Sequence, residues 1–386
     1  MRKLGRAVST LCHMAHRGLR CDHILPSKAE ESGPTLYGVQ IRTQRIELTK
    51  RHPLTISRGT IKGSTNLVVI VEHEDVIGLG EMAPSDVTGD SAESAEAAIT
   101  TWADDLSQLS PSEFDRIGEV VRSTNGSAVR CALDMACHDW LGRKLGVPVW
   151  SLLGIDRSRT PATSLTIGID TISVLETKVP EILHRTQPKI LKVKLGQAAG
   201  IDVDKEMFAA VQSIVDTVRA PITWRVDANG GWSLDDALRM IPWLGERGVD
   251  MIEQPLAQGN EEALGALSGL SVPIFADESI RMSHDVARFA HLVDGVNLKL
   301  MKCGGLREAI RIIHTARAHG LQVMIGCMGE SSLAISAGAQ LGGMVDALDL
   351  DSHLNLVDDP FEGAPYSDGR VLANDQPGLG VSWRQP

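Results

Sequence analysis

The chain has 386 residues, with 38 Lys or Arg against 49 Asp or Glu, and therefore a formal net charge of −11. Its hydrophobic fraction of 43% and charged fraction of 23% are close to the averages of soluble globular proteins, which excludes collagen-like and disordered chains. With 4% aromatic residues it lacks the basic, aromatic surface of a nucleic-acid-binding protein, and its longest aliphatic run, Leu67–Val71, is too short to span a bilayer.

The first segment, residues 1–36, differs from the rest of the chain. Its first 20 residues carry five Lys or Arg and no acid, and Ser9, Thr10 and His13 interrupt the apolar stretch that a signal peptide would need. We expect a disordered tail or an upstream start here, with a transit peptide as the alternative. The six cysteines of the whole chain include no Cys-x-x-Cys pair and are too sparse for a disulfide scaffold, which predicts reduced thiols in a cytoplasmic protein.

Residues 37–160 have the pattern of a separate α+β unit. Apolar and polar side chains alternate over Tyr37–Thr49 and Asn66–Glu74, as in antiparallel strands with one buried face. Longer periodic segments over Ser91–Leu109 and Val129–Leu145 predict helices.

Residues 161–360 alternate short β-branched runs with helical patterns. Eight runs are strand candidates: Ala162–Gly168, Ile190–Leu195, Ile222–Asp227, Asp250–Glu253, Pro273–Asp277, Gly295–Leu300, Leu321–Gly326 and Asp346–Leu350. An amphipathic helix pattern follows each of them, for example over Asp235–Gly245 and Leu306–His319. Eight such units predict a parallel (β/α) barrel with right-handed crossovers. A doubly wound sheet is the alternative, but it would normally carry a glycine fingerprint after an early strand, and this chain has none.

The last segment, residues 361–386, returns to Gly- and Pro-rich irregular sequence. We expect it to pack back on the α+β unit formed by residues 37–160.

Three consecutive strand candidates of the barrel end in an acid, namely Asp227, Glu253 and Asp277. Reactive groups of such barrels lie at the carboxyl ends of the strands, so these carboxylates should converge and repel one another unless a cation lies between them. Oxygen-only ligands favour a hard ion, which predicts Mg²⁺. The alternative is that each acid caps the helix that follows it.

Three lysines belong to the same end of the barrel. Lys192 and Lys194 are two residues apart on one strand and point to the same side, whereas Lys299 lies four strands away, across the barrel. This placement suits an acid and a base on opposite faces of one carbon, with Lys192 and Mg²⁺ lowering the pKa of Lys194. The alternative is that the lysines extend to solvent.

A further pair of acids, Asp349 and Asp351, shares one side of the last strand candidate. Beyond the three metal ligands, such a pair suggests recognition of a cation such as a substrate ammonium. A helix cap plus a surface charge is the alternative.

These motifs resemble the enolase superfamily, muconate-lactonizing subgroup, and within it the dipeptide epimerases of the L-Ala-D/L-Glu type. The resemblance covers about residues 37–386, and residues 1–36 match nothing in the family. It rests on the strand-end residues, with the final Asp-x-Asp typical of dipeptide epimerases. It also includes Gly78-Leu79-Gly80-Glu81 with Pro84, and the segment Ser127–Asp134.

The resemblance implies a modified TIM barrel with an α+β capping domain and a role for each matching residue. Lys194 and Lys299 would be the acid/base pair, and the three acids would bind Mg²⁺, which Mn²⁺ can replace. Lys192 would contact the substrate carboxylate or polarise Lys194. Asp349 and Asp351 would bind the free α-ammonium of the dipeptide. Thr166, Cys327 and Gly329 would line the pocket, and the loop Ile56–Thr60 would close over the barrel. Arg58 in that loop matches a position where relatives can place an arginine for an acidic side chain; a solvated loop charge is the alternative.

The implied reaction is a Mg²⁺-dependent epimerisation at the α-carbon of the C-terminal residue of a dipeptide, through an ene-diolate and two lysines. Alternatives within the superfamily are N-acylamino-acid racemisation, o-succinylbenzoate synthesis and cycloisomerisation; Asp349 and Asp351 argue against them, since their substrates have no free ammonium. A non-catalytic barrel is a further alternative. The expected partner is a small dipeptide, with no nucleic acid and no membrane, and the family also allows a homo-oligomer. The preferred dipeptide does not follow from the sequence.

Overall fold

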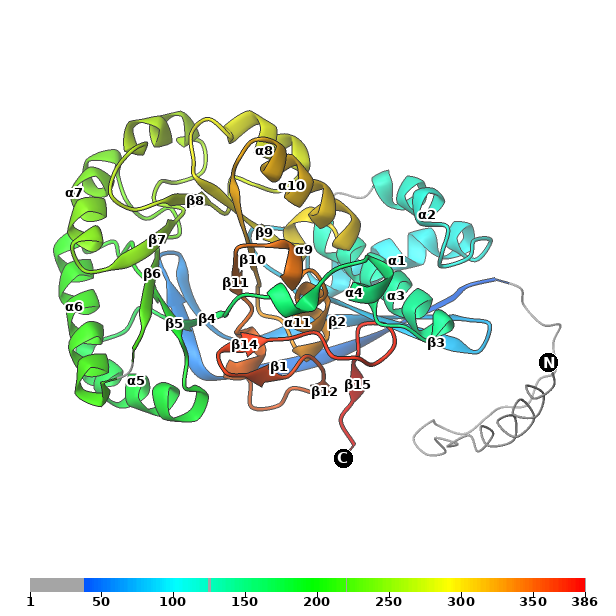
Figure 1. The fold of residues 1–386 in the computed structure, drawn as a ribbon. Helices are drawn as coiled ribbons and strands as arrows, with labels where there is room; N and C mark the ends of the chain where they lie inside the picture. Colours follow the sequence, from blue (N-terminus) through cyan, green and yellow to red (C-terminus); the bar gives the residue numbers. More distant parts are fainter. Residues whose placement is uncertain (1–37, 124–125, 220, 386) are drawn as a thin grey trace, which may run out of the picture. The chain divides into compact units, whose positions relative to one another are not determined.

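The computed structural model describes residues 38–123, 126–219 and 221–385, in which a three-stranded antiparallel sheet with helices lies beside an eight-stranded parallel barrel (Figure 1). The expected tail over residues 1–36 falls outside the described residues. No helix in the described residues combines the length and the apolar character that crossing a membrane requires.

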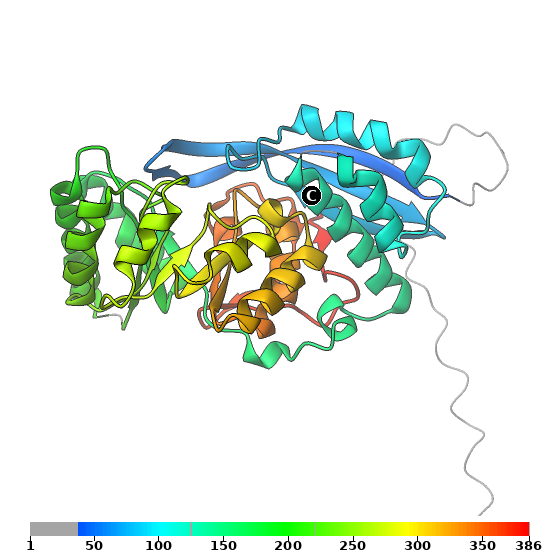
Figure 2. The same ribbon diagram turned by 90° about the horizontal axis from the view of Figure 1, so that it is seen from above.

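The capping unit is built on a long hairpin. Strands β1 (Gln40–Ile56) and β2 (Gly59–His73) pair along their length, and β3 (Val76–Met82) adds to the other edge of β2. Helices α1 (Ala92–Leu106), α2 (Phe114–Val120) and α3 (Ser127–Leu145) follow, then α4 (Val149–Leu152). The hairpin reaches from this unit across one end of the barrel, as the blue strands of Figure 2 show.

Strand β3 was missing from the sequence prediction, and the two predicted strands were too short. Glycines, which disfavour strands, stand at Gly78 and Gly80 because α3 packs directly on them. A Cβ at Gly78 would lie 2.1 Å from the carbonyl oxygen of Ala136, and one at Gly80 would lie 1.9 Å from that of Ala132. The Gly-x-Gly motif therefore serves close packing between strand and helix.

The barrel strands run in sequence order from β4 to β11, all parallel. A parallel bridge between Thr163 and Leu348 brings the two edge strands together and nearly closes the barrel. The strands are β4 (Ser164–Ile167), β5 (Ile190–Lys194), β6 (Thr223–Asp227), β7 (Val249–Glu253), β8 (Ile274–Ala276), β9 (Gly295–Lys299), β10 (Gln322–Gly326) and β11 (Ala347–Asp349). The predicted fold class, a parallel barrel with an α+β cap, is confirmed.

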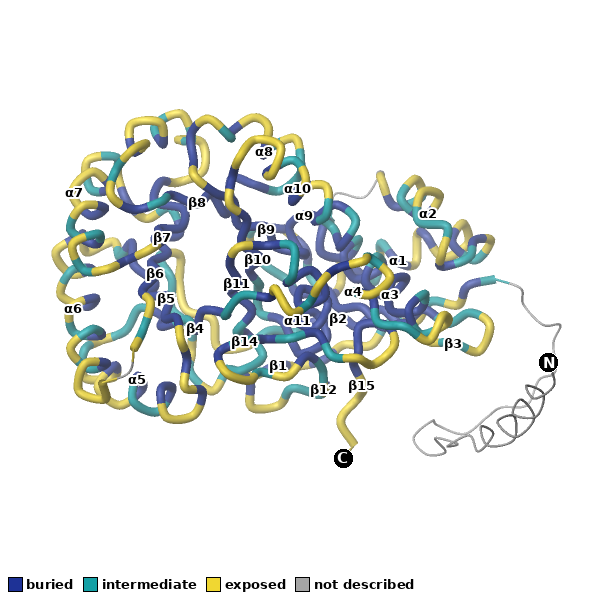
Figure 3. The backbone as a smooth tube through the Cα atoms, in the orientation of Figure 1, coloured by how far each residue is buried: buried dark blue, intermediate teal, exposed yellow. Residues whose placement is uncertain are grey.

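Helices surround the barrel, and most of them expose an outer face while the strands are buried (Figure 3). They are α5 (Ile172–Thr186), α6 (Ile201–Val218), α7 (Leu234–Gly245), α8 (Ser283–Phe289), α9 (Leu300–Cys303), α10 (Leu306–Ala318) and α11 (Ser332–Gln340). Helices α9 and α11 are instead buried along their whole length.

The expectation of a helix pattern after every strand was wrong at two places. A 3₁₀ segment, Glu261–Leu267, follows β7, and another, Ser352–Asn355, follows β11. Glycines at 259, 265 and 269 weaken an α-helix at the first place. At the second, the chain instead pairs with the cap, through a bridge between Lys50 and Leu356.

The C-terminal segment forms two small antiparallel pairs, β12 (Phe361–Glu362) with β15 (Ser382–Trp383), and β13 (Tyr366–Ser367) with β14 (Arg370–Val371). It also contacts α3, where Leu379 N–H donates to Asp139 Oδ1 at 2.7 Å and Arg143 donates to the Val381 carbonyl at 2.8 Å. Further bonds join it to α4, such as the 2.9 Å bond from Val149 N–H to the Gly378 carbonyl.

Two acidic residues of the capping unit accept hydrogen bonds at the N-termini of barrel helices. Glu81 is buried and accepts from the main-chain N–H groups of Ser331 at 2.9 Å and Ala334 at 3.1 Å, at the start of α11. Asp134 accepts from the N–H of Leu306, the first residue of α10, at 2.6 Å. Because free N–H groups at a helix start attract negative charge, both acids fix the cap to the barrel.

Candidate active site

Three carboxylates converge at the carboxyl end of the barrel. Asp227 ends β6, Glu253 ends β7 and Asp277 follows β8, and each is 0% exposed. One oxygen of each lies within 4.8 Å of the others. Three buried carboxylate oxygens at this spacing fit a hard divalent cation such as Mg²⁺.

Two lysines flank this group of acids from opposite sides. Lys194 on β5 bonds Asp227, and Lys299 on β9 donates to Asp277 Oδ2 at 2.7 Å. Strands β6, β7 and β8 separate β5 from β9, so the two ammonium groups face one another across the acids. Lys299 therefore lies four strands away from Lys194, as the order of the strand candidates predicted.

Lys192 and Lys302 are more deeply buried than this pair. Lys192, 1% exposed, lies 3.0 Å from Glu253 Oε2 and also bonds Asp349. Lys302 on α9, also 1% exposed, bonds the carboxylate and the main-chain carbonyl of Asp277, and the Asn297 carbonyl at 3.0 Å. Each of the three converging carboxylates therefore has a lysine partner.

The pKa shifts follow from this burial and pairing. Burial, and then repulsion from Asp227, raises the pKa of Glu253 to about 8. Burial would also raise the pKa of Asp277, but Lys299 and Lys302 outweigh it and hold that pKa well below its usual range. Burial would lower the pKa of Lys299, but attraction to Asp277 and Glu253 raises it instead. Lysine charges therefore offset part of the repulsion among these acids.

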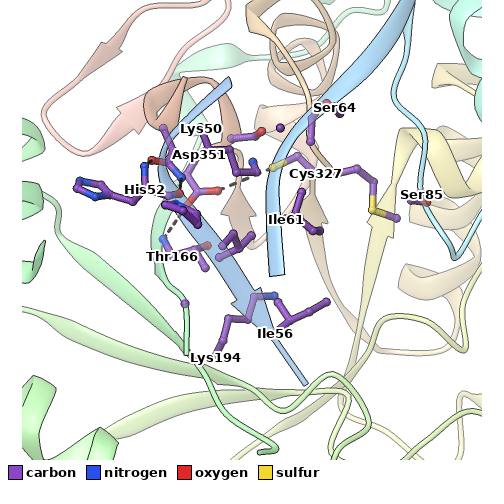
Figure 4. A pocket seen from close by; sticks show the side chains of 18 of the residues that line it. Lys50, His52, Ile56, Ile61, Ser64, Ser85, Thr166, Lys194, Cys327 and Asp351 are labelled. Atoms are coloured by element: carbon purple, nitrogen blue, oxygen red, sulfur yellow. Dashed lines mark hydrogen bonds between the residues drawn. The ribbon is translucent and has the colours of Figure 1, made fainter. Parts of the chain in front are cut away.

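A cavity of about 560 Å³ lies between the barrel and the cap hairpin, with Lys194 and Lys299 in its wall (Figure 4). Lys192 and the three acids are not part of its lining. Eight of the predicted site residues line it: Arg58, Thr166, Lys194, Lys299, Cys327, Gly329, Asp349 and Asp351. The cap contributes apolar side chains to its wall, among them Leu54, Ile56 and Ile61.

The two acids of the Asp-x-Asp pair have different partners. Asp349 accepts from Ser164 Oγ at 2.6 Å and bonds Lys192, so its charge is already compensated, and Lys192 lowers its pKa despite burial. Asp351 accepts from the N–H of Thr166 at 2.6 Å and lies 3.9 Å from the Cys327 thiol. Burial and repulsion from Asp349 raise the pKa of Asp351.

Arg58 lines the cavity, but its guanidinium is engaged by the barrel. It lies 2.9 Å from Glu278 Oε1 and donates to the Asn229 carbonyl at 3.1 Å. Gly329, on the opposite wall, accepts at its carbonyl from Asn66 of β2 at 2.8 Å.

Several site residues were missing from the sequence prediction. Asn297, which donates to Glu253 Oε1 at 2.6 Å, and Ser164 stand two residues before Lys299 and Thr166, so strand periodicity could have found them. Lys302 lies in the short helix α9 that follows β9, so the alternation of side chains along a strand does not predict its position.

Comparison with known proteins agrees with this geometry. Residues 39–154 match the family described as mandelate racemase / muconate lactonizing enzyme, N-terminal domain, and residues 176–386 match the enolase C-terminal domain-like family. The chain is 46% identical over 344 residues to the hydrophobic dipeptide epimerase of Roseobacter litoralis, covering 89% of this chain and 98% of that protein. It is 39% identical over 340 residues to the L-Ala-D/L-Glu epimerase of Bacteroides thetaiotaomicron, covering 87% and 85%.

Among solved structures, the dipeptide epimerase of Enterococcus faecalis V583, in complex with Mg and the dipeptide L-Leu-L-Tyr, superposes with a TM-score of 0.81. It shares 30% sequence identity, and the match covers 89% of this chain and 99% of that one. With both family matches, the buried acids and the flanking lysines in place, this chain belongs to the mandelate racemase / muconate lactonizing enzyme family of the enolase superfamily.

Proposed function

We propose that this protein is a dipeptide epimerase that inverts the α-carbon of the C-terminal residue by proton transfer between Lys194 and Lys299. The observation that carries the proposal is the placement of both lysines in the wall of one cavity that Asp351 also lines, with Lys194 paired to Asp227 and Lys299 paired to Asp277. The names of the relatives in Roseobacter litoralis and Enterococcus faecalis support it.

Asp227, Glu253 and Asp277 would hold a Mg²⁺ ion, which Mn²⁺ is expected to replace. When bound, the ion supplies positive charge that stabilises the negative charge building up on the substrate carboxylate as the α-proton leaves. An adjacent cation also favours a neutral lysine over a charged one, which is the state a base must have.

The lysines then act in sequence on one carbon. The Nζ of one unprotonated lysine takes the α-proton, so that a C–H bond breaks and an N–H bond forms. The protonated Nζ of the other lysine donates a proton to the opposite face of the carbon, which inverts it. The lysine that acts as base for one epimer acts as acid for the other, and nothing else in the dipeptide changes.

Asp351 would bind the free α-ammonium of the first residue, because it is the member of the acid pair without a lysine hydrogen-bonded to it in the described residues. This role distinguishes a dipeptide from an N-acylated amino acid, whose nitrogen carries no charge. Asp349 would act indirectly, by holding Lys192 in place.

The cavity wall favours hydrophobic side chains on the substrate. Leu54, Ile56 and Ile61 of the hairpin, together with Met328, face the same space as the lysines. Burial of such surface stabilises a bound apolar side chain by about 25 cal/mol per Å². The hairpin also covers the lysines, and exclusion of water keeps solvent from protonating the reacting carbon in place of the two lysines.

Solvent exchange tests the proposal. The protein is incubated with Mg²⁺ in D₂O with matched L,L- and L,D-dipeptides, their N-acetyl analogues and the corresponding N-succinyl amino acids, and the mass of each compound is followed together with the ratio of epimers. We expect a mass gain of one unit and epimerisation for hydrophobic dipeptides, and neither in the Lys194→Ala/Lys299→Ala double variant. Exchange confined to the N-acylated compounds would replace the proposal by N-acylamino-acid racemisation.

A further inference from the structure

Two neighbouring residues, Ser57 and Arg58, tie the tip of the cap hairpin to the barrel mouth. Ser57 Oγ donates to the Asn229 carbonyl at 3.1 Å, Arg58 donates to the same carbonyl at 3.1 Å, and Arg58 lies 2.9 Å from Glu278 Oε1. We propose that Arg58 is a positioning residue that latches the hairpin over the lysines, and that it does not bind an acidic substrate side chain. The expected effect of Arg58 on turnover rests on the proposed function, whereas its effect on the hairpin does not.

The receiving side of the latch is built from buried groups. The Glu278 side chain is 6% exposed and that of Arg58 is 40% exposed. Glu278 directly follows Asp277, so without Arg58 another buried negative charge would stand beside the acid group. Its Oε2 has no hydrogen-bond partner among the described residues, and Oε1 is shared by Arg58 and the side-chain amide of Asn229, at 3.3 Å from the amide.

Asn229 connects the latch to a proposed metal ligand. Its main-chain N–H donates to Asp227 Oδ1 at 2.8 Å and its side-chain amide donates to Asp227 Oδ2 at 3.1 Å. The backbone of Asn229 has a φ of 44°, in the left-handed region that Asn tolerates better than most residues. The same residue thus holds Asp227 through its N–H groups and Arg58 through its carbonyl.

The latched hairpin covers the proposed base. Ile56, two residues before Arg58, lies beside Lys194 in the cavity (Figure 4). If the tip moved away, Lys194 would meet water on the side where Ile56 now packs. An arginine in this position therefore affects both water exclusion and the placement of the cavity wall.

The latch also bears on specificity. An arginine that reads a substrate carboxylate needs donors that are free to turn toward it, whereas Nη1 of Arg58 is already shared between Glu278 and the Asn229 carbonyl. We therefore expect Arg58 to contribute to turnover of every dipeptide, whatever the charge of its second side chain.

A double-mutant cycle tests this inference. Arg58→Ala, Glu278→Gln and the double variant are compared on two dipeptides that share a first residue and end in Leu or Glu. Arg42→Ala is the matched control, since Arg42 pairs with Glu72 at 3.1 Å on the exposed part of the same sheet.

We expect each single variant to lower kcat/KM about tenfold on both dipeptides, an effect between those of exposed and buried ion pairs. The double variant should be no worse than the more affected single variant, Arg58→Lys should recover part of the loss, and Arg42→Ala should change nothing. A loss confined to the dipeptide ending in Glu, or losses that multiply in the double variant, would overturn the latch.

Hydrogen exchange of the hairpin gives a second readout that needs no substrate. The amides of residues 54–62 should exchange faster in both single variants than in the wild type, and at the wild-type rate in Arg42→Ala. Unchanged exchange in Arg58→Ala would contradict the latch. If the wild type epimerised no dipeptide, the proposed function would fail, while this exchange measurement would still decide the latch.

Discussion

Replacing Asp351 by Asn removes the negative charge that we assign to the substrate ammonium while keeping the shape of the side chain. Asn retains a carbonyl oxygen that can accept the 2.6 Å bond from the N–H of Thr166, so the local backbone should not move. The three buried acids and both lysines lie on other strands and should stay assembled.

The expected loss is large because the charge pair is sheltered. Removing one partner of a hydrogen-bonded charge pair inside a binding site costs on the order of 2–5 kcal/mol. At ~1.4 kcal/mol per factor of ten, this corresponds to about 30-fold or more in kcat/KM. Burial and Asp349 raise the pKa of Asp351, and among the described residues this carboxylate forms no ion pair within 4 Å.

The assay compares kcat/KM for a hydrophobic dipeptide and its N-acetyl analogue, in the wild type and in Asp351→Asn. We expect the variant to lose efficiency mainly on the dipeptide, so that the preference for a free amino terminus shrinks. If the analogue is not turned over, its inhibition constant replaces kcat/KM. Asp349→Asn is the contrasting variant, since it removes one of the two negative charges that the buried Lys192 contacts and should impair both compounds. A parallel loss on both compounds in Asp351→Asn would refute the reasoning.

Three further results are expected. Chelation with EDTA should abolish epimerisation and Mg²⁺ or Mn²⁺ should restore it; full activity after exhaustive chelation would contradict the metal assignment. Lys302→Met should lower the free energy of unfolding in urea by about 3 kcal/mol, because it breaks a buried ion pair with Asp277, whereas Met at the exposed Lys189 should change it little; equal effects would refute the role of Lys302. Burial raises the pKa of Glu330 to about 8 from an ordinary 4.5, so the native state keeps a proton that the unfolded chain loses between those values. The contribution of Glu330 to stability therefore falls as pH rises through this window, and Glu330→Gln should flatten that fall in urea titrations at pH 5 and 8 with EDTA present; an unchanged slope would be contrary to it.

The barrel strands could be predicted from sequence because most are short apolar runs with β-branched residues, and five of the eight end in a charged residue. The convergence of Asp227, Glu253 and Asp277 followed from one topological rule, that parallel strands of a barrel end at the same face. The position of Lys299 opposite Lys194 followed from counting strands. These inferences needed no knowledge of side-chain contacts.

What escaped prediction depends on tertiary contacts. Strand β3 contains the glycines that packing against α3 requires, and these mask its strand character. The pairing of Arg58 with Glu278 depends on the left-handed turn at Asn229 and on a hairpin that returns from far away in the sequence. No local sequence pattern predicts strand β3 or the pairing of Arg58 with Glu278.

The most direct test of the central claim measures exchange separately for each epimer in the single-lysine variants. Lys194→Ala and Lys299→Ala are each incubated with the L,L- and the L,D-dipeptide in D₂O, and both deuterium incorporation and epimer ratio are recorded. The two-lysine account predicts that neither variant interconverts the epimers. It also predicts that any residual exchange is confined to one epimer, the opposite one in the two variants, because each retains a single base. Epimerisation at the wild-type rate by either variant would contradict it.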